Sequence, residues 1–185
     1  MTLHPLLNLN TLLLLTLCSI TTTAAPSVHH DPQTVHVHGM TEIQMLIGVN
    51  QIEILLESPA IDIVGFERTA KTKMEKQQVL DAKAILSRPA SLFHINDIRC
   101  STVTSIVNVH GLLKNDHPHT KQSAHSGIKA NYQLSCPAID ALKSIEFKIF
   151  SHFPNISELN IQWVSETEQG QRVLNASNNR LVFGN

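Results

Sequence analysis

The stretch from Thr41 to Ser58, TEIQMLIGVNQIEILLES, decides the fold of this chain. Apolar and polar residues alternate on both sides of Gly48-Val49-Asn50-Gln51, and a period of two is typical of half-buried β-strands. We predict a strand over residues 35–47 and another over 52–57, joined by this turn as a hairpin. The residues expected to face the core are Val35, Val37, Thr41, Ile43, Met45, Ile47, Ile52, Ile54 and Leu56.

One main helix is predicted over Lys73–Ser87. Thr72 and Glu75 have the spacing of a capping box at its start, and a proline two residues after Ser87 stops it. The apolar residues Val79, Ala82 and Leu86 recur at helical spacing and mark its buried face. A short helical turn is also expected at Ser58-Pro59, with Ser58 as the N-cap.

Short apolar or alternating stretches predict further strands over residues 90–95, 100–109, 128–136, 145–150, 159–164 and 180–183. The expected fold class is therefore α+β. It combines a mostly antiparallel sheet, for which two packed layers are one arrangement that fits, with one main helix and a histidine-containing loop at 110–127. The pattern leaves the order of the strands open.

The chain begins with the features of a secretory signal peptide, which we assign to residues 1–24. The apolar block Leu12–Leu17 is too short to span a bilayer, so cleavage after Ala24 is expected rather than stable membrane insertion. Residues 25–34 are then a flexible leader, and residues 35–185 a single domain.

Two cysteines, Cys100 and Cys136, remain in the exported part. They predict one disulfide, with two buried free thiols as the alternative.

Charge and motifs exclude several functional classes. The formal net charge is -1 and no basic stripe is present, which argues against nucleic acid as a partner. HExxH, GxSxG and phosphate-loop motifs are all missing from the sequence, so no enzyme class is indicated. Asp62, Glu67 and Arg68 follow a helix start, and an ordinary corner between elements explains them.

Histidine is unusually frequent, with 11 in the chain, and its first grouping is His36-Val37-His38. On a strand these two imidazoles would share the outward face, about 6.5–7 Å apart, and a modest rotation would bring both onto one zinc ion. His29 and His30 lie nearby on the leader. The alternative is two solvated histidines on a strand face.

The second grouping is in the loop and comprises His110, Asp116, His117, His119 and His125. A bridge between the two cysteines would place His117-Pro118-His119 at the tip of the loop between their strands. With both thiols bridged, imidazole and carboxylate remain as the expected zinc ligands. The alternative is a surface loop with incidental histidines.

Several segments stand in a specific order and spacing: HVHG at 36–39, SPAIDIVGFE at 58–67, LFHI at 92–95, Cys100, YQLSC at 132–136, FKIFSHFPNISELNIQW at 147–163, Gly170-Gln171 and the NNRLVF tail. Together they give the chain a resemblance to the ZrgA-type periplasmic zinc-uptake proteins of Gram-negative bacteria. It implies a periplasmic protein that binds zinc and aids its uptake, with His36 and His38 as the N-terminal pair and residues 110–125 as the family's histidine-rich insert.

Two departures from the family pattern matter. The insert holds only four histidines and Asp116, which implies a smaller zinc capacity, and Arg68 stands where family members commonly carry histidine. The resulting prediction is an accessory protein without chemistry of its own. It would capture or buffer zinc for an uptake transporter or its binding protein. The alternatives are an envelope structural or protein-interaction module with incidental histidines and, less well supported, a hydrolytic zinc enzyme.

Overall fold

The computed structural model describes residues 37–96, 98–114 and 126–184. The signal peptide assigned to residues 1–24, the leader at 25–34 and the loop tip at 115–125 lie outside these residues, so those assignments stay predictions.

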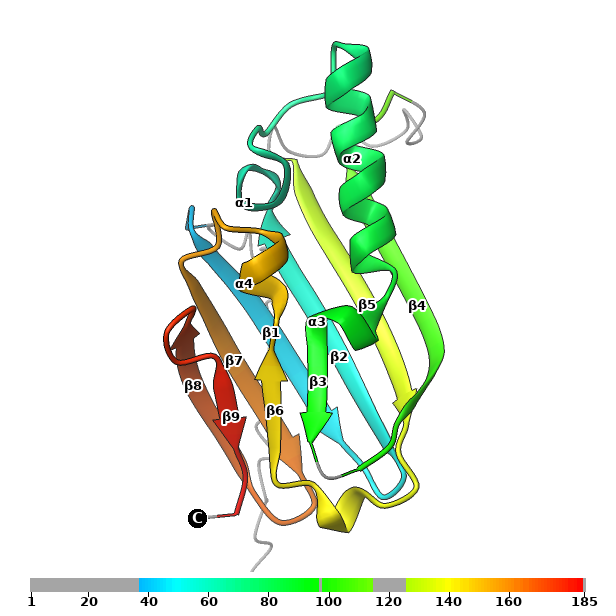
Figure 1. Ribbon diagram of the computed structural model, residues 1–185, viewed down its shortest axis with the longest axis vertical. Helices are drawn as coiled ribbons and strands as arrows, with labels where there is room; N and C mark the ends of the chain where they lie inside the picture. Colours follow the sequence, from blue (N-terminus) through cyan, green and yellow to red (C-terminus); the bar gives the residue numbers. More distant parts are fainter. Residues whose placement is uncertain (1–36, 97, 115–125, 185) are drawn as a thin grey trace, which may run out of the picture. The chain divides into compact units, whose positions relative to one another are not determined.

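A six-stranded sheet and a three-stranded sheet form the framework (Figure 1). In spatial order the large sheet contains β4 (Ser101–His110), β5 (Gly127–Ser135), β2 (Gln51–Pro59), β1 (Met40–Ile47), β7 (Glu158–Ser165) and β8 (Gln169–Asn175). All its neighbours are antiparallel except β1 and β7, which run parallel. The small sheet is antiparallel and contains β3 (Phe93–Asn96), β6 (Ser144–Phe147) and β9 (Arg180–Val182).

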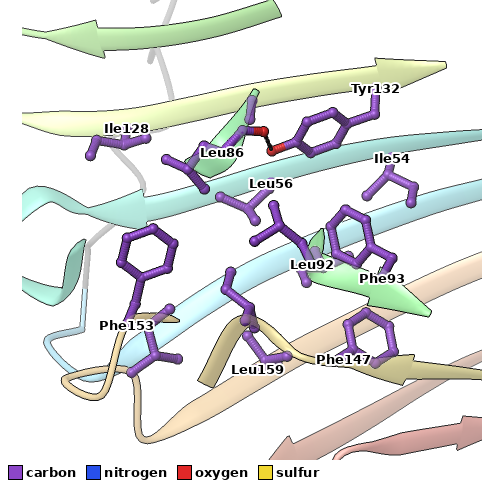
Figure 2. Packing of buried hydrophobic residues seen from close by; sticks show 14 of the residues in the cluster. Ile54, Leu56, Leu86, Leu92, Phe93, Ile128, Tyr132, Phe147, Phe153 and Leu159 are labelled. Carbon is purple, nitrogen blue, oxygen red and sulfur yellow. Dashed lines mark hydrogen bonds between the residues drawn. The ribbon is translucent and has the colours of Figure 1, made fainter. Parts of the chain in front are cut away.

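The small sheet and the helices pack against one face of the large sheet, which confirms the α+β class and its two layers (Figure 1). The helices are α1 (Ala60–Val64), α2 (Lys73–Leu86), α3 (Pro89–Leu92) and α4 (Ile149–His152), with a 3-10 turn η1 at Ile139–Ala141. Figure 2 shows the packing between the layers, where Phe93 meets Tyr132 and Phe147 edge to face. The Tyr132 hydroxyl donates to the carbonyl oxygen of Leu86 at 2.8 Å, which ties β5 to the end of α2.

The central hairpin is confirmed, because Ile43, Met45, Ile52, Ile54 and Leu56 are all buried. Its first strand begins later than predicted, at Met40 rather than at residue 35. The amide of Met40 donates to the carbonyl of Val37 at 3.1 Å and closes a turn, and Gly39 has a φ of 84°. The side chain of Val37 is therefore 56% exposed instead of facing the core.

Helix α2 has the predicted capping box, with both hydrogen bonds between Thr72 and Glu75 present, and the predicted buried face. The assignment of Ser58 as an N-cap is wrong, because β2 continues to Pro59 and α1 starts at Ala60. The hydroxyl of Ser58 is buried in the sheet and lies 2.8 Å from that of Thr41. A side chain held by the neighbouring strand cannot also cap a helix.

Three other segments differ from the prediction. The expected strand at 90–95 begins as α3, and the one at 145–150 ends in α4, whose Ile149 is buried. Strand β8 was missed because its sequence, QGQRVLN, lacks a clear apolar alternation. Its Gly170 lies beneath the indole of Trp163 on β7, where a Cβ atom would collide with the ring.

The disulfide between Cys100 and Cys136 is confirmed, with Cα atoms 4.4 Å apart. The strands that follow and precede these cysteines pair as β4 and β5, with a β-bulge between Thr102 and Thr104. The bulge shifts the register by one residue, so Tyr132 faces Ser105. The bridge therefore closes one end of the large sheet, and the histidine-containing loop leaves from the other end.

Candidate functional site

His38 lies in the turn that precedes β1, with 60% of its side chain exposed. Its Nε2 atom is 3.2 Å from Oε2 of Glu67, so the imidazole can donate a hydrogen bond to that carboxylate. Glu67 belongs to the segment between α1 and α2, and its side chain is 23% exposed. The contact joins two segments separated by 29 residues in the chain.

The turn that carries His38 is fixed through the backbone of Gly39. Its amide donates to Oδ1 of the buried Asp62 at 2.8 Å, and its carbonyl accepts from the amides of Ser157 and Glu158 at 2.8 and 2.9 Å. A φ of 84° is readily adopted only by glycine, and a Cβ here would lie 3.1 Å from Oγ of Ser157. Two of the segments quoted above for the resemblance, HVHG and SPAIDIVGFE, are therefore joined at this turn by the hydrogen bond between Gly39 and Asp62.

The segment that carries Glu67 is fixed by its neighbour. Arg68 donates to both carboxylate oxygens of Glu75, at 2.6 and 3.2 Å, and its guanidinium lies 5.1 Å from the ring centre of Phe66. Arg68 and the backbone amides of Thr72 and Lys71 together lower the pKa of Glu75 to about 2. Arg68 therefore holds this segment against the start of α2.

The same segment also reaches the base of the histidine-containing loop. The Thr69 hydroxyl donates to the carbonyl of Gly111 at 3.0 Å, and the amide of Ala70 donates to the carbonyl of Leu112 at 2.9 Å. These residues directly follow the exposed His110, the last residue of β4. His38 and His110, one from each histidine grouping, thus lie at the same end of the large sheet, where β1 begins and β4 ends (Figure 1). Three strand spacings separate β1 from β4, or about 14 Å.

Of the predicted zinc ligands, the structure describes two, His38 and His110. The others lie outside the described residues, namely His29, His30, His36, Asp116, His117, His119 and His125. Within the described ranges, no three His, Cys, Asp or Glu side chains are grouped closely enough to hold a metal ion. Glu42, an acidic residue of β1, accepts a hydrogen bond from the Asn160 side-chain amide at 2.8 Å.

Sequence reasoning noted Glu67 but assigned it to an ordinary corner between elements rather than to the site. Its contact with His38 depends on how the α1–α2 corner folds back onto the start of β1, and no local periodicity reports such a contact. The one available signal was a carboxylate in a segment, SPAIDIVGFE, already quoted for the family resemblance.

The model of one protein family, described as ZrgA family zinc uptake protein, matches residues 35–183. The chain belongs to the ZrgA family. A search of curated proteins gave no match. Among the helices of this ZrgA-family chain that the structure describes, none is long and apolar enough to cross a membrane. The family assignment indicates a role in zinc uptake, and imidazole and carboxylate are side chains that zinc accepts as ligands.

Proposed function

We propose that this protein is a periplasmic zinc-binding accessory protein. It captures or buffers zinc and passes the ion to an uptake transporter or to that transporter's binding protein, without catalysing a reaction. Membership of a zinc-uptake family supports the zinc role. The predicted signal peptide supports export.

The observation that carries the proposal is the exposed imidazole of His38 on a backbone already fixed by Gly39. An immobilised ligand loses little conformational entropy when a metal binds. A ligand on a loop must first be ordered, which costs about 1–2 kcal/mol per residue fixed. We therefore assign the tighter zinc event to the His36 and His38 pair. A weaker event belongs to the loop ligands His110, Asp116, His117, His119 and His125, with His29 and His30 as auxiliary ligands.

Exchange suits this arrangement better than catalysis. A catalytic zinc site needs three fixed protein ligands, an open position and a nearby general base. The exposed imidazole of His38 lies beside the carboxylate of Glu67, and an exposed site allows the ion to leave as readily as it enters. The alternative of an envelope interaction module with incidental histidines predicts no specific zinc binding at all.

The test is calorimetric titration with zinc of the exported protein and of three variants. Two of these are double variants that remove ligands, and one is a single-residue control. His36→Ala/His38→Ala should remove the tightest event, whereas His117→Ala/His119→Ala should lower the number of zinc ions bound and leave the tightest affinity nearly unchanged. His152→Ala is the control, since its imidazole lies 3.2 Å from the carbonyl oxygen of Ser91 rather than beside Glu67. The reverse ranking of the two double variants would move the principal site to the loop, and absence of binding would end the zinc proposal.

Proton competition gives a second check on the ligand class. An imidazole must be neutral to bind zinc, and histidines usually take up a proton near pH 6.5. Zinc affinity should therefore fall markedly between pH 7.5 and pH 5.5. Equal affinities at the two pH values would show that histidine is not the main ligand.

A further inference from the structure

We propose that Glu67 is a zinc ligand, which binds the same ion as His38 through Oε2 while the imidazole binds through Nε2. This inference rests on the proposed function, and it adds a residue outside the histidine groupings to the site. It makes the tighter site a mixed imidazole–carboxylate site.

The first argument is the spacing of the two donor atoms. Nε2 of His38 and Oε2 of Glu67 are 3.2 Å apart. Two ligand atoms of a tetrahedral zinc ion, each about 2.0–2.1 Å from the metal, lie about 3.3 Å from one another. A zinc ion can therefore replace the shared proton with little movement of either side chain.

The second argument is the kind of partner that Glu67 has. Three other carboxylates in the described part of the chain contact a permanently charged side chain: Glu57 with Lys129, Glu75 with Arg68, and Glu146 with Arg180. An arginine or a protonated lysine offers only hydrogen-bond donors and cannot share a metal. Glu67 alone among them faces an imidazole, which becomes a metal ligand once it is neutral.

The third argument is that the carboxylate is held in place before a metal arrives. On one side, Gly65 ends α1 with a φ of 81° and its amide donates to the carbonyl of Ile61 at 2.9 Å. On the other side, Arg68 is fastened to Glu75, and Thr69 to the carbonyl of Gly111. Both donors thus stand on backbone segments fixed by hydrogen bonds, which is the condition for a preorganised metal site.

Two protein ligands leave coordination positions on the ion for water or for a group on the protein that receives the metal. Imidazole with carboxylate is a donor set for Zn²⁺ and similar divalent ions rather than for Cu⁺, which prefers sulfur ligands. The site therefore has the chemistry for divalent zinc and the open positions that transfer requires.

The experiment compares Glu67→Gln with Glu146→Gln in the full exported chain. Glu146 is a matched control because its side chain is 26% exposed, against 23% for Glu67, and it is also ion-paired, with Arg180. Calorimetry should show the tightest zinc event weakened at least ~10-fold in Glu67→Gln and unchanged in Glu146→Gln. Loss of even a residue that only hydrogen-bonds to a metal ligand lowers metal affinity about 10–100-fold. Melting curves recorded with a chelator should show no difference between the two variants.

Glu67→His separates ligation from a structural role. A histidine at this position offers zinc another donor, so it should restore most of the affinity and shift the visible absorption of the cobalt-substituted protein. A purely structural carboxylate would not be rescued by histidine. Wild-type affinity in Glu67→Gln, together with loss in His36→Ala/His38→Ala, would overturn the Glu67 assignment and leave the proposed function standing. Absence of zinc binding in the unaltered protein would overturn both.

Discussion

The two ends of the large sheet are built by different means. At one end the bond between Cys100 and Cys136 closes β4 onto β5, and the amide of Cys136 donates to the carbonyl of Asn50 in the hairpin turn at 2.8 Å. At the other end, where His38 and Glu67 meet, the described contacts are non-covalent, and several of them are hydrogen bonds and ion pairs. We call these the disulfide end and the histidine end.

From this difference we infer that the disulfide end contributes mainly to stability and the histidine end mainly to zinc binding. A covalent bridge limits the conformations of the unfolded chain, so the connection at the disulfide end persists when single non-covalent contacts are lost. The histidine end depends on a few polar contacts whose individual free energies are modest, about 0.5–1.5 kcal/mol each. Changes at the first end should alter the free energy of unfolding, and changes at the second should alter zinc binding more than stability.

Removal of the bridge should have the largest effect on stability. Cys100→Ala/Cys136→Ala opens a loop whose ends are 36 residues apart in the chain. The chain-entropy relation gives a loss of about 4 kcal/mol for a loop of this length. Denaturant unfolding of the double variant, compared with the unaltered protein with and without reductant, measures this loss.

The same double variant also tests the separation of the two ends. Zinc affinity under native conditions should stay close to that of the unaltered protein, because no described contact of His38 or Glu67 involves the bridge. A large loss of zinc affinity in a variant that is still folded would show that the two ends are coupled.

The sequence predicted the disulfide end better than the histidine end, and the reason is physical. The hairpin, α2 and the disulfide follow from local alternation, a capping box and two cysteines in a chain predicted to be exported, and each was predicted correctly. Contacts between distant segments carry no such pattern. The parallel pairing of β1 with β7 and the approach of Glu67 to His38 are set by how the layers pack.

Two local errors also come from tertiary context. The alternation through Val37 predicted a strand, but Gly39 with its positive φ and the buried Asp62 turn the chain there. Gly170 reads as a strand breaker in isolation, yet β8 forms because the indole of Trp163 fills the space above it. In both cases the residue that decides the outcome lies in another element.

The next largest effect is expected from Gly39→Ala. An alanine forced into a left-handed conformation costs about 1–2 kcal/mol, and its Cβ would lie 3.1 Å from Oγ of Ser157. Relaxing that strain moves the turn that carries His38, so zinc affinity should fall together with stability. Calorimetry and denaturant unfolding of the same preparation measure the two effects.

Gly184→Ala provides the matched control for backbone strain. Gly184 also has a positive φ, 74°, and a Cβ there would meet nothing within 4 Å. This variant should lose a similar or smaller amount of stability and keep its zinc affinity. Equal zinc affinities in the Gly39 and Gly184 variants would show that the turn does not position a metal ligand.

The smallest effect should come from the exposed ion pair of Arg68 and Glu75, and it should depend on pH. In the folded protein the pKa of Glu75 lies at about 2, below the ordinary value of 4.5, chiefly because Arg68 donates to its carboxylate. A carboxyl whose pKa is lowered by folding stabilises the folded state above its ordinary pKa. That contribution is lost as the pH falls from 4.5 toward about 2.

Glu75→Gln should therefore be slightly less stable than the unaltered protein at neutral pH, and the difference should shrink as the pH is lowered through this window. Melting temperatures at several pH values and at low salt measure it, because salt screens an exposed pair. Glu53→Gln is the control, since Glu53 accepts only from the neutral amide of Gln51 at 3.3 Å. A difference that stays constant down to pH 2 would mean that the cap geometry, rather than the charge of Glu75, fastens the segment of Glu67 to α2.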